Sequence, residues 1–249
     1  MIVQAPARQG RHAPRFTVPT LVLRLAGFAV AGFATDGRGL LLRKPLAQAA
    51  GPHAAESFWA QACGFLGLQE PMPSRIVLPL TDHARRLAAE VIAQHAGSAG
   101  DFVCIAPFAG GLVDKQPKRW PGFPAFAQRL QGLGLPILVC PGPAAEVAEA
   151  KALYPGATLV ENLPLDAYAA LLGQARLVVA NDTGPAHLAA AAAAPLLSVL
   201  GPTKTRQWRP WGPTVTALGG DGQWPDPDRV WQTACALAQA ASPLQSARE

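Results

Sequence analysis

The residues best suited to chemistry lie in one segment, where an apolar run ends in small polar residues and continues as an alanine-rich stretch. From position 178 this segment reads Val-Val-Ala-Asn-Asp-Thr-Gly-Pro-Ala-His-Leu-Ala-Ala. Asp182 or Thr183 would cap a helix that begins here, and Gly184 would let a ligand approach the backbone closely. Free amides and the positive end of the helix dipole would then face an anion. The segment predicts an anion site, and a well-capped structural helix explains the same residues equally well.

A second segment, downstream of another apolar run, carries glycines and cations. From position 108 it reads Phe-Ala-Gly-Gly-Leu-Val-Asp-Lys-Gln-Pro-Lys-Arg-Trp-Pro. Gly110 and Gly111 expose backbone amides, and the cations that follow suit phosphate oxygens: Lys115, Lys118 and Arg119. The P-loop spacing GxxxxGK[ST] and the dinucleotide pattern GxGxxG are absent from the sequence, which disfavours those two nucleotide sites. An ordinary surface loop is the alternative.

Short apolar runs alternate with longer amphipathic stretches from about residue 101 onward, as they do in parallel βαβ units. The expected strands are 102–107, 135–140, 158–160, 177–180, 196–200 and 214–218. The expected helices are 123–133, 144–153, 165–175, one that opens near Thr183, and 226–240. Both candidate segments then follow strands, at the edge where such sheets bind ligands. The pattern predicts an α/β fold with a Rossmann-like C-terminal domain.

The first hundred residues give a weaker pattern. The expected elements are helices at 54–66 and 82–94 and strands around Leu21 and Val77. Thr81 or Asp82 would cap the second helix. The stretch Ala-Gly-Ser-Ala-Gly at 96–100 is small and polar, which suits a domain junction. We therefore expect a partial N-terminal domain at 1–98 and a complete C-terminal domain at 99–249.

Composition and charge narrow the class of protein. The 249 residues are 50% hydrophobic, which allows a large core and disfavours disorder. The net charge of +5 arises in residues 1–48, where seven Lys and Arg accompany the single acid Asp36. Such a segment suits an anionic lipid, a nucleic acid or a phosphorylated substrate, or is simply solvated. The four cysteines form no CxxC pair, so free thiols are expected, and no apolar run reaches the roughly 18 residues of a membrane span.

Four motifs follow one another between about residues 100 and 215. They are Pro107-Phe-Ala-Gly-Gly with Lys118-Arg-Trp-Pro, Cys140-Pro-Gly-Pro-Ala-Ala-Glu146, Asn181-Asp-Thr-Gly-Pro-Ala-His187, and Leu200-Gly-Pro-Thr203. In this order and spacing they resemble glycosyltransferase family 9, the heptosyltransferases of lipopolysaccharide core synthesis. The resemblance implies a GT-B fold with two Rossmann-like domains, of which the C-terminal one binds the ADP-sugar donor.

The resemblance also implies a role for each candidate residue. Lys118 matches the catalytic cation that neutralises the donor pyrophosphate, with Trp120 packed beside it. Glu146 matches the acid that accepts hydrogen bonds from ribose hydroxyls, and Leu163 would lie where the adenine is held. The phosphates and sugar would meet the glycine loop and the DTGxxH motif, which supply Gly110, Gly111, Asp182, Thr183, Gly184 and His187. Glu146 as a solvated acid, His187 as a core histidine, and Trp120 and Leu163 as packing residues are the structural alternatives.

The chain departs from the family at its start. Family members usually open with a strand and a Gly-Asp loop whose aspartate is the general base, whereas this chain opens Met-Ile-Val-Gln-Ala-Pro-Ala-Arg. Asp36 is the sole early acid, so only its position recommends it as the base. The resemblance implies an inverting, metal-independent transferase that moves heptose or a related sugar to a lipopolysaccharide core acceptor. A non-catalytic nucleotide-sugar-binding module is the alternative, and an unrelated nucleotide-binding α/β enzyme would explain the sheet but not the motifs.

Two features that imitate other sites are given structural roles. Asp226-Pro-Asp228 looks like the DxD metal motif of another glycosyltransferase fold, but it opens the final helix, where the dipole favours acids. Trp208, Trp211 and Trp224 lie among prolines and glycines, so we expect them to anchor irregular backbone rather than stack on bases.

We expect no metal, no cofactor and no nucleic-acid partner. The resemblance implies a phosphorylated, lipid-linked saccharide acceptor and a cytoplasmic location, with peripheral contact to the inner membrane left open.

Overall fold

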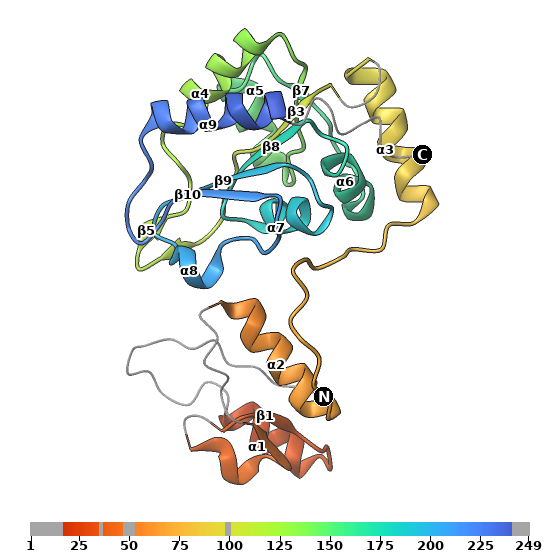
Figure 1. The fold of residues 1–249 in the computed structure, drawn as a ribbon, viewed down its shortest axis with the longest axis vertical. Coiled ribbons are helices and arrows are strands. Elements are labelled where there is room, and N and C mark those ends of the chain that lie inside the picture. The colour runs from red at the N-terminus through yellow and green to blue at the C-terminus, as the bar shows by residue number, and fades with distance from the viewer. Residues whose placement is uncertain (1–16, 35–36, 47–52, 98–100, 241–249) are drawn as a thin grey trace. The chain divides into compact units, whose positions relative to one another are not determined.

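The contacts of the chain divide it into two compact units, Met1–Pro73 and Ser74–Glu249. The computed structural model describes residues 17–34, 37–46, 53–97 and 101–240 (Figure 1). The domain junction predicted from the sequence, between residues 98 and 99, lies further along the chain than this division after Pro73. Helix α3 (Asp82–His95) accounts for the difference, because it packs against α6 (Leu165–Leu172) and so belongs to the second unit.

The first unit contains two short parallel strands, β1 (Ala31–Phe33) and β2 (Lys44–Leu46). Helix α2 (Ala54–Leu66) packs against both strands, and a capping box between His53 and Glu56 begins it. The strand expected around Leu21 is wrong, because this residue lies in helix α1 (Thr17–Leu25). A short run of leucine and valine has no clear period, so the sequence pattern alone does not separate helix from strand here.

The second unit is built on one parallel sheet with the strand order β10-β9-β8-β3-β6-β7. Its strands, in chain order, are β3 (Val103–Ala106), β6 (Ile137–Val139), β7 (Thr158–Leu159), β8 (Leu177–Asn181), β9 (Leu196–Leu200) and β10 (Val215–Gly219). The chain starts at the centre, builds outward to β7, then returns to build outward to β10. This is the doubly wound order of a Rossmann-like domain, which confirms the predicted α/β fold.

Helices cover both faces of this sheet, and alternate residues of each strand face opposite ways. Cys104 and Val178 pack with α3, α6 and α7 (Gly184–Ala191). Ile105 and Val179 pack with α4 (Phe123–Leu130), α5 (Ala144–Leu153) and α9 (Pro227–Ala240) on the other face (Figure 1). Burial on both faces explains why these strands are continuous apolar runs in the sequence.

Two local features differ from the expectations. The strand expected around Val77 is wrong: this residue lies outside the described helices and strands, two positions before Pro79, which cannot donate to a ladder. A hairpin of β4 (Leu112–Val113) and β5 (Gln116–Pro117) was not expected. Its turn residues Asp114 and Lys115 have φ of 49° and 66°, as in a type I′ turn. This hairpin ends immediately before Lys118.

The sequence also led us to expect free cysteine thiols and no apolar run long enough to span a membrane. All four cysteines are free thiols, as expected, and Cys63 and Cys104 are buried. Within the described ranges, no helix has the length and apolar character needed to cross a bilayer.

Thr81 is the N-cap of α3, and its Oγ1 accepts a hydrogen bond from the Ala84 amide at 3.1 Å. We expect Thr81→Ala to lower the free energy of unfolding by about 1 kcal/mol, because that amide loses its acceptor. Urea unfolding followed by tryptophan fluorescence measures the change. Thr81→Ser keeps the hydroxyl and is the control; an equal loss in both variants would contradict the capping role.

Candidate functional site

The carboxyl ends of β3 and β8 lie side by side, because these two strands pair in parallel with Ala106 opposite Ala180. The segment after β3 and the segment after β8 therefore leave the sheet at the same edge. The strand order also reverses here, since the chain runs from β3 toward β7 and from β8 toward β10. Doubly wound sheets bind ligands at this switch point. The sequence predicted that both candidate loops follow strands at the ligand-binding edge, and the strand order now places both at the switch point.

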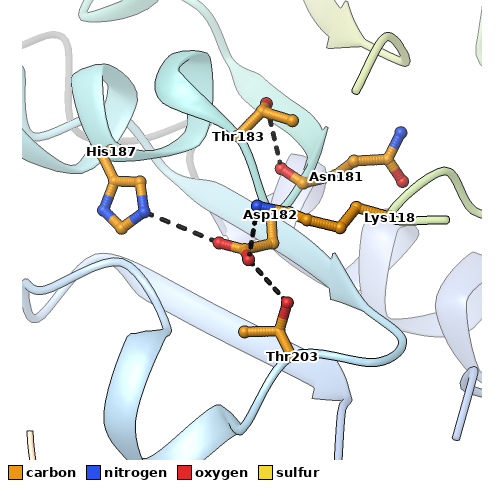
Figure 2. Close-up of polar contacts among 6 residues, drawn as sticks. All are labelled: Lys118, Asn181, Asp182, Thr183, His187 and Thr203. Atoms are coloured by element: carbon orange, nitrogen blue, oxygen red, sulfur yellow. Dashed lines mark hydrogen bonds and ion pairs between the residues drawn. The ribbon is translucent and has the colours of Figure 1, made fainter. Parts of the chain in front are cut away.

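An ion pair joins the two loops across this edge (Figure 2). Lys118 Nζ lies 3.0 Å from Asp182 Oδ2, with side-chain exposures of 22% and 7%. The Thr203 hydroxyl, from the loop after β9, donates to the same carboxylate oxygen at 2.6 Å. His187 Nε2 lies 3.6 Å from the other oxygen, Oδ1, and its side chain is half-exposed. Three side chains, from the loop after β3, the loop after β9 and helix α7, thus converge on one carboxylate.

The charge state of Asp182 follows from this arrangement. Burial alone would raise the pKa of its carboxyl group. The interactions with His187 and Thr203 and the positive charge of Lys118 outweigh burial and lower the pKa to about 2. Asp182 is therefore ionised at neutral pH, and it anchors Lys118 rather than exchanging protons.

Helix α7 begins directly after this carboxylate, with Thr183, one of the two predicted positions, at the N-cap and Pro185 in the first turn. The Thr183 side chain makes no capping hydrogen bond; its hydroxyl lies 3.4 Å from the Asn181 carbonyl oxygen instead. Gly184 is exposed, and a Cβ there would meet no atom within 4 Å. The amino end of α7 therefore keeps its backbone accessible to an anion.

In the segment after β3, the two glycines are exposed to solvent, whereas Trp120 at its end is buried. Gly110 and Gly111 are exposed, and Gly111 has a φ of 79°, which favours glycine. The guanidinium of Arg119, the neighbouring candidate phosphate cation, pairs with Glu149 of α5. Trp120 is 4% exposed and packs in the core against Phe123 and Phe126, so its side chain anchors the end of the loop in the core.

The two residues expected near the nucleoside, Glu146 and Leu163, follow strands β6 and β7. Glu146 is partly buried in the first turn of α5, after β6, and its Oε2 accepts a hydrogen bond from the Gly142 amide at 2.8 Å. Leu163 lies between β7 and α6, partly buried against the core, and it follows Asn162 at a φ of 57°. Both positions stay predictions as nucleoside contacts.

Two residues that the candidate set omitted also take part in this network. Thr203 hydrogen-bonds Asp182, and the Leu-Gly-Pro-Thr motif was the signal that could have identified it. Asn181 is fully buried and hydrogen-bonds two distant backbone groups, which no local pattern indicates.

The Asp226-Pro-Asp228 motif has the structural role expected of it. Asp226 Oδ1 accepts from the Arg229 amide at 3.0 Å at the start of α9, and Asp228 pairs with Arg129 at 2.7 Å. In the part of the chain that the structure describes, no group of three or more His, Cys, Asp or Glu residues is placed to hold a metal ion.

The sequence of this chain matches a known family over most of its length. Residues 15–238 match the family described as glycosyltransferase family 9 (heptosyltransferase). The chain belongs to this family. Lipopolysaccharide heptosyltransferase 3 of Escherichia coli is 31% identical over 126 residues, and lipopolysaccharide heptosyltransferase 1 of Pseudomonas aeruginosa is 37% identical over 109 residues. These alignments cover 47% and 42% of this chain but 36% and 31% of the relatives, so the match spans about a third of their length.

Solved family 9 structures share the fold. The E. coli ADP-heptose lps heptosyltransferase II superposes with a TM-score of 0.69 at 21% identity, covering 92% of this chain and 76% of that chain. The E. coli heptosyltransferase WaaC with ADP gives a TM-score of 0.63 at 22% identity, covering 84% and 66%. The predicted GT-B type of fold is therefore confirmed for this family 9 chain.

The low pKa of Asp182 predicts an acid-sensitive contribution to stability. Because the folded value, about 2, lies below the unfolded value of about 3.9, this contribution is complete above about pH 5 and is lost as the pH falls toward 2. It amounts to about 2 kcal/mol. We expect the difference in unfolding free energy between wild type and Asp182→Asn to shrink by this amount between pH 5 and pH 2.

Asp114→Asn is the matched control, because it makes the same chemical change on an exposed turn residue whose positive φ suits asparagine. Urea titrations at several pH values measure both variants. A difference for Asp182→Asn that does not vary with pH would contradict the charged role of this carboxylate.

Proposed function

We propose that the second unit binds an ADP-sugar, with ADP-heptose as the donor. The observation that carries this proposal is the Lys118 ammonium, which lies 3.0 Å from Asp182, directly before the N-cap residue Thr183 of α7. A lysine has three N–H donors, so one can bind Asp182 while two remain for phosphate oxygens. Solved relatives in complex with ADP and with ADP-2-deoxy-2-fluoro heptose support the choice of ligand.

The reaction proposed is transfer of the heptose to a lipopolysaccharide core acceptor with inversion. An acceptor hydroxyl oxygen attacks the anomeric carbon, the bond from that carbon to the diphosphate oxygen breaks, and ADP leaves. A general base takes the hydroxyl proton. Lys118 and the amides at Thr183 and Gly184 stabilise the negative charge that develops on the leaving diphosphate. Because Lys118 supplies this charge stabilisation, we propose that the reaction needs no divalent metal.

The acceptor side is proposed from charge and family membership. A phosphorylated, lipid-linked saccharide suits the basic residues of the first 48 positions. Such an acceptor would be met in the cytoplasm at the inner membrane surface, with peripheral contact. Asp36, the early acid that only its position recommends as a general base, lies outside the described residues.

A second candidate function is a nucleotide-sugar-binding module without catalysis. One observation favours it: Asp182, the carboxylate at the centre of the site, has a pKa of about 2 and is committed to Lys118 and Thr203. So weak a base gives little general-base catalysis at neutral pH. Binding without transfer is the behaviour that would distinguish this module from the transferase.

We expect Lys118→Ala to weaken ADP binding by about 10- to 150-fold, since loss of a charge-assisted phosphate contact costs about 1.5 to 3 kcal/mol. Isothermal titration calorimetry with ADP measures this. Lys151→Ala is the control, because it makes the same substitution on a lysine of α5 that is 66% exposed and lies outside both candidate loops. Equal ADP affinity in wild type and Lys118→Ala would exclude Lys118 from the donor site.

We expect the full chain to transfer heptose from ADP-heptose to a lipid A-Kdo acceptor at the same rate with and without EDTA, because Lys118 and α7 supply the positive field. Release of ADP and mass of the glycosylated acceptor are the two readouts. Loss of transfer in EDTA that magnesium restores would contradict metal independence. ADP-heptose binding without any transfer would instead favour the binding module.

A further inference from the structure

The side chain of Asn181 bridges two ends of the candidate phosphate loop. Asn181 ends β8 and is fully buried. Its Oδ1 accepts a hydrogen bond from the Trp120 backbone amide at 3.0 Å, and its Nδ2 donates to the Pro107 carbonyl oxygen at 2.5 Å. Pro107 begins the loop that follows β3, and Trp120 ends it, two residues after Lys118. One amide side chain therefore closes the whole loop.

These contacts bind backbone groups that are costly to leave unpaired. Trp120 is 4% exposed and Pro107 is also buried, so water would not easily replace either partner. The Trp120 ring is fixed separately by Phe123, at 5.9 Å between ring centroids. Asn181 thus links the backbone of the buried residue Trp120 to the end of β8, directly before Asp182.

We propose that Asn181 is a positioning residue of the donor site, acting through Lys118. By fixing both ends of the loop, it keeps the Lys118 ammonium beside Asp182 and the amino end of α7 (Figure 2). Asn181 is fully buried, so it does not itself touch a ligand. The inference rests on the proposed function for its ligand, and on the structure for the loop that it closes.

The chemistry of this position requires an amide. One end must accept from an N–H and the other must donate to a carbonyl oxygen, which Asn does and neither an ionised Asp nor Ala can do. Asp at position 181 would keep the acceptor for the Trp120 amide but would turn a carboxylate oxygen toward the Pro107 carbonyl. The two variants Asn181→Ala and Asn181→Asp therefore release different contacts.

The test measures ADP and adenosine binding to the full chain by calorimetry for wild type, Asn181→Ala, Lys118→Ala and the double variant. We expect Asn181→Ala to weaken ADP binding by about 5- to 30-fold and adenosine by less than about twofold, because the loop serves the phosphates. In the Lys118→Ala background the same change should cost less than about twofold, since the two residues act as one unit. An unchanged ADP affinity, an equal loss for adenosine, or independent losses in the double variant would overturn the inference.

Ser198→Ala is the matched control. Ser198 is a fully buried polar residue in the next strand, β9, and its hydroxyl has no hydrogen-bond partner among the described residues. We expect this variant to bind both ligands as wild type does. An ADP loss as large as that of Asn181→Ala would mean that the effect comes from general disturbance of the sheet, which would overturn the positioning role.

Hydrogen exchange at the Trp120 amide separates this inference from the proposed function. We expect the amide to be protected in wild type and in Asn181→Asp, and to exchange faster in Asn181→Ala. If wild type binds no ADP, the proposed function fails, and faster exchange in Asn181→Ala still supports Asn181 as the residue that closes the loop. Equal protection in all three proteins would show that Asn181 does not hold the loop.

Discussion

The Lys118–Asp182 ion pair is the interaction on which the candidate site depends. It joins loops that follow two adjacent strands, and it holds the ammonium 3.0 Å from the carboxylate before any ligand arrives. A flexible lysine normally loses side-chain freedom when it binds a ligand. Here Asp182 limits that freedom in advance, and Thr203 fixes the carboxylate itself. Binding can therefore use the charge of Lys118 without first having to order its side chain.

The same ion pair limits how the site can attract an anion. Asp182 cancels the charge of Lys118, and Glu149 pairs with the neighbouring Arg119. Residues 49–249 hold fourteen Lys and Arg against fifteen acids, so this part of the chain has no general excess of positive charge. Recognition of a diphosphate must then depend on directed donors, namely the lysine N–H groups and the amides at the start of α7. Such recognition selects for geometry more than for charge.

Sequence patterns predicted the elements that carry the site but not the contacts between them. The helix at 144–153 and the strand at 196–200 appear with the expected bounds, because prolines and glycines lie close to both ends of each segment in the sequence. Leu21 and Val77 were assigned wrongly, where a short apolar run and a nearby proline gave no reliable period. The Asp182 network and the bridge at Asn181 join residues far apart in the chain. Their partners follow from the strand order, which periodicity does not provide.

The position of Asp182 also bears on where the general base of a transferase would lie. If Asp182 took the proton of an acceptor hydroxyl, its charge would be lost and Lys118 would lose its anchor. That loss would occur while negative charge develops on the leaving diphosphate, when a fixed ammonium matters most. A pKa of about 2 keeps Asp182 ionised throughout, so the ammonium stays in place. Anchoring the cation and accepting the proton are therefore incompatible tasks for one carboxylate, and a transferase of this design needs its base on another residue.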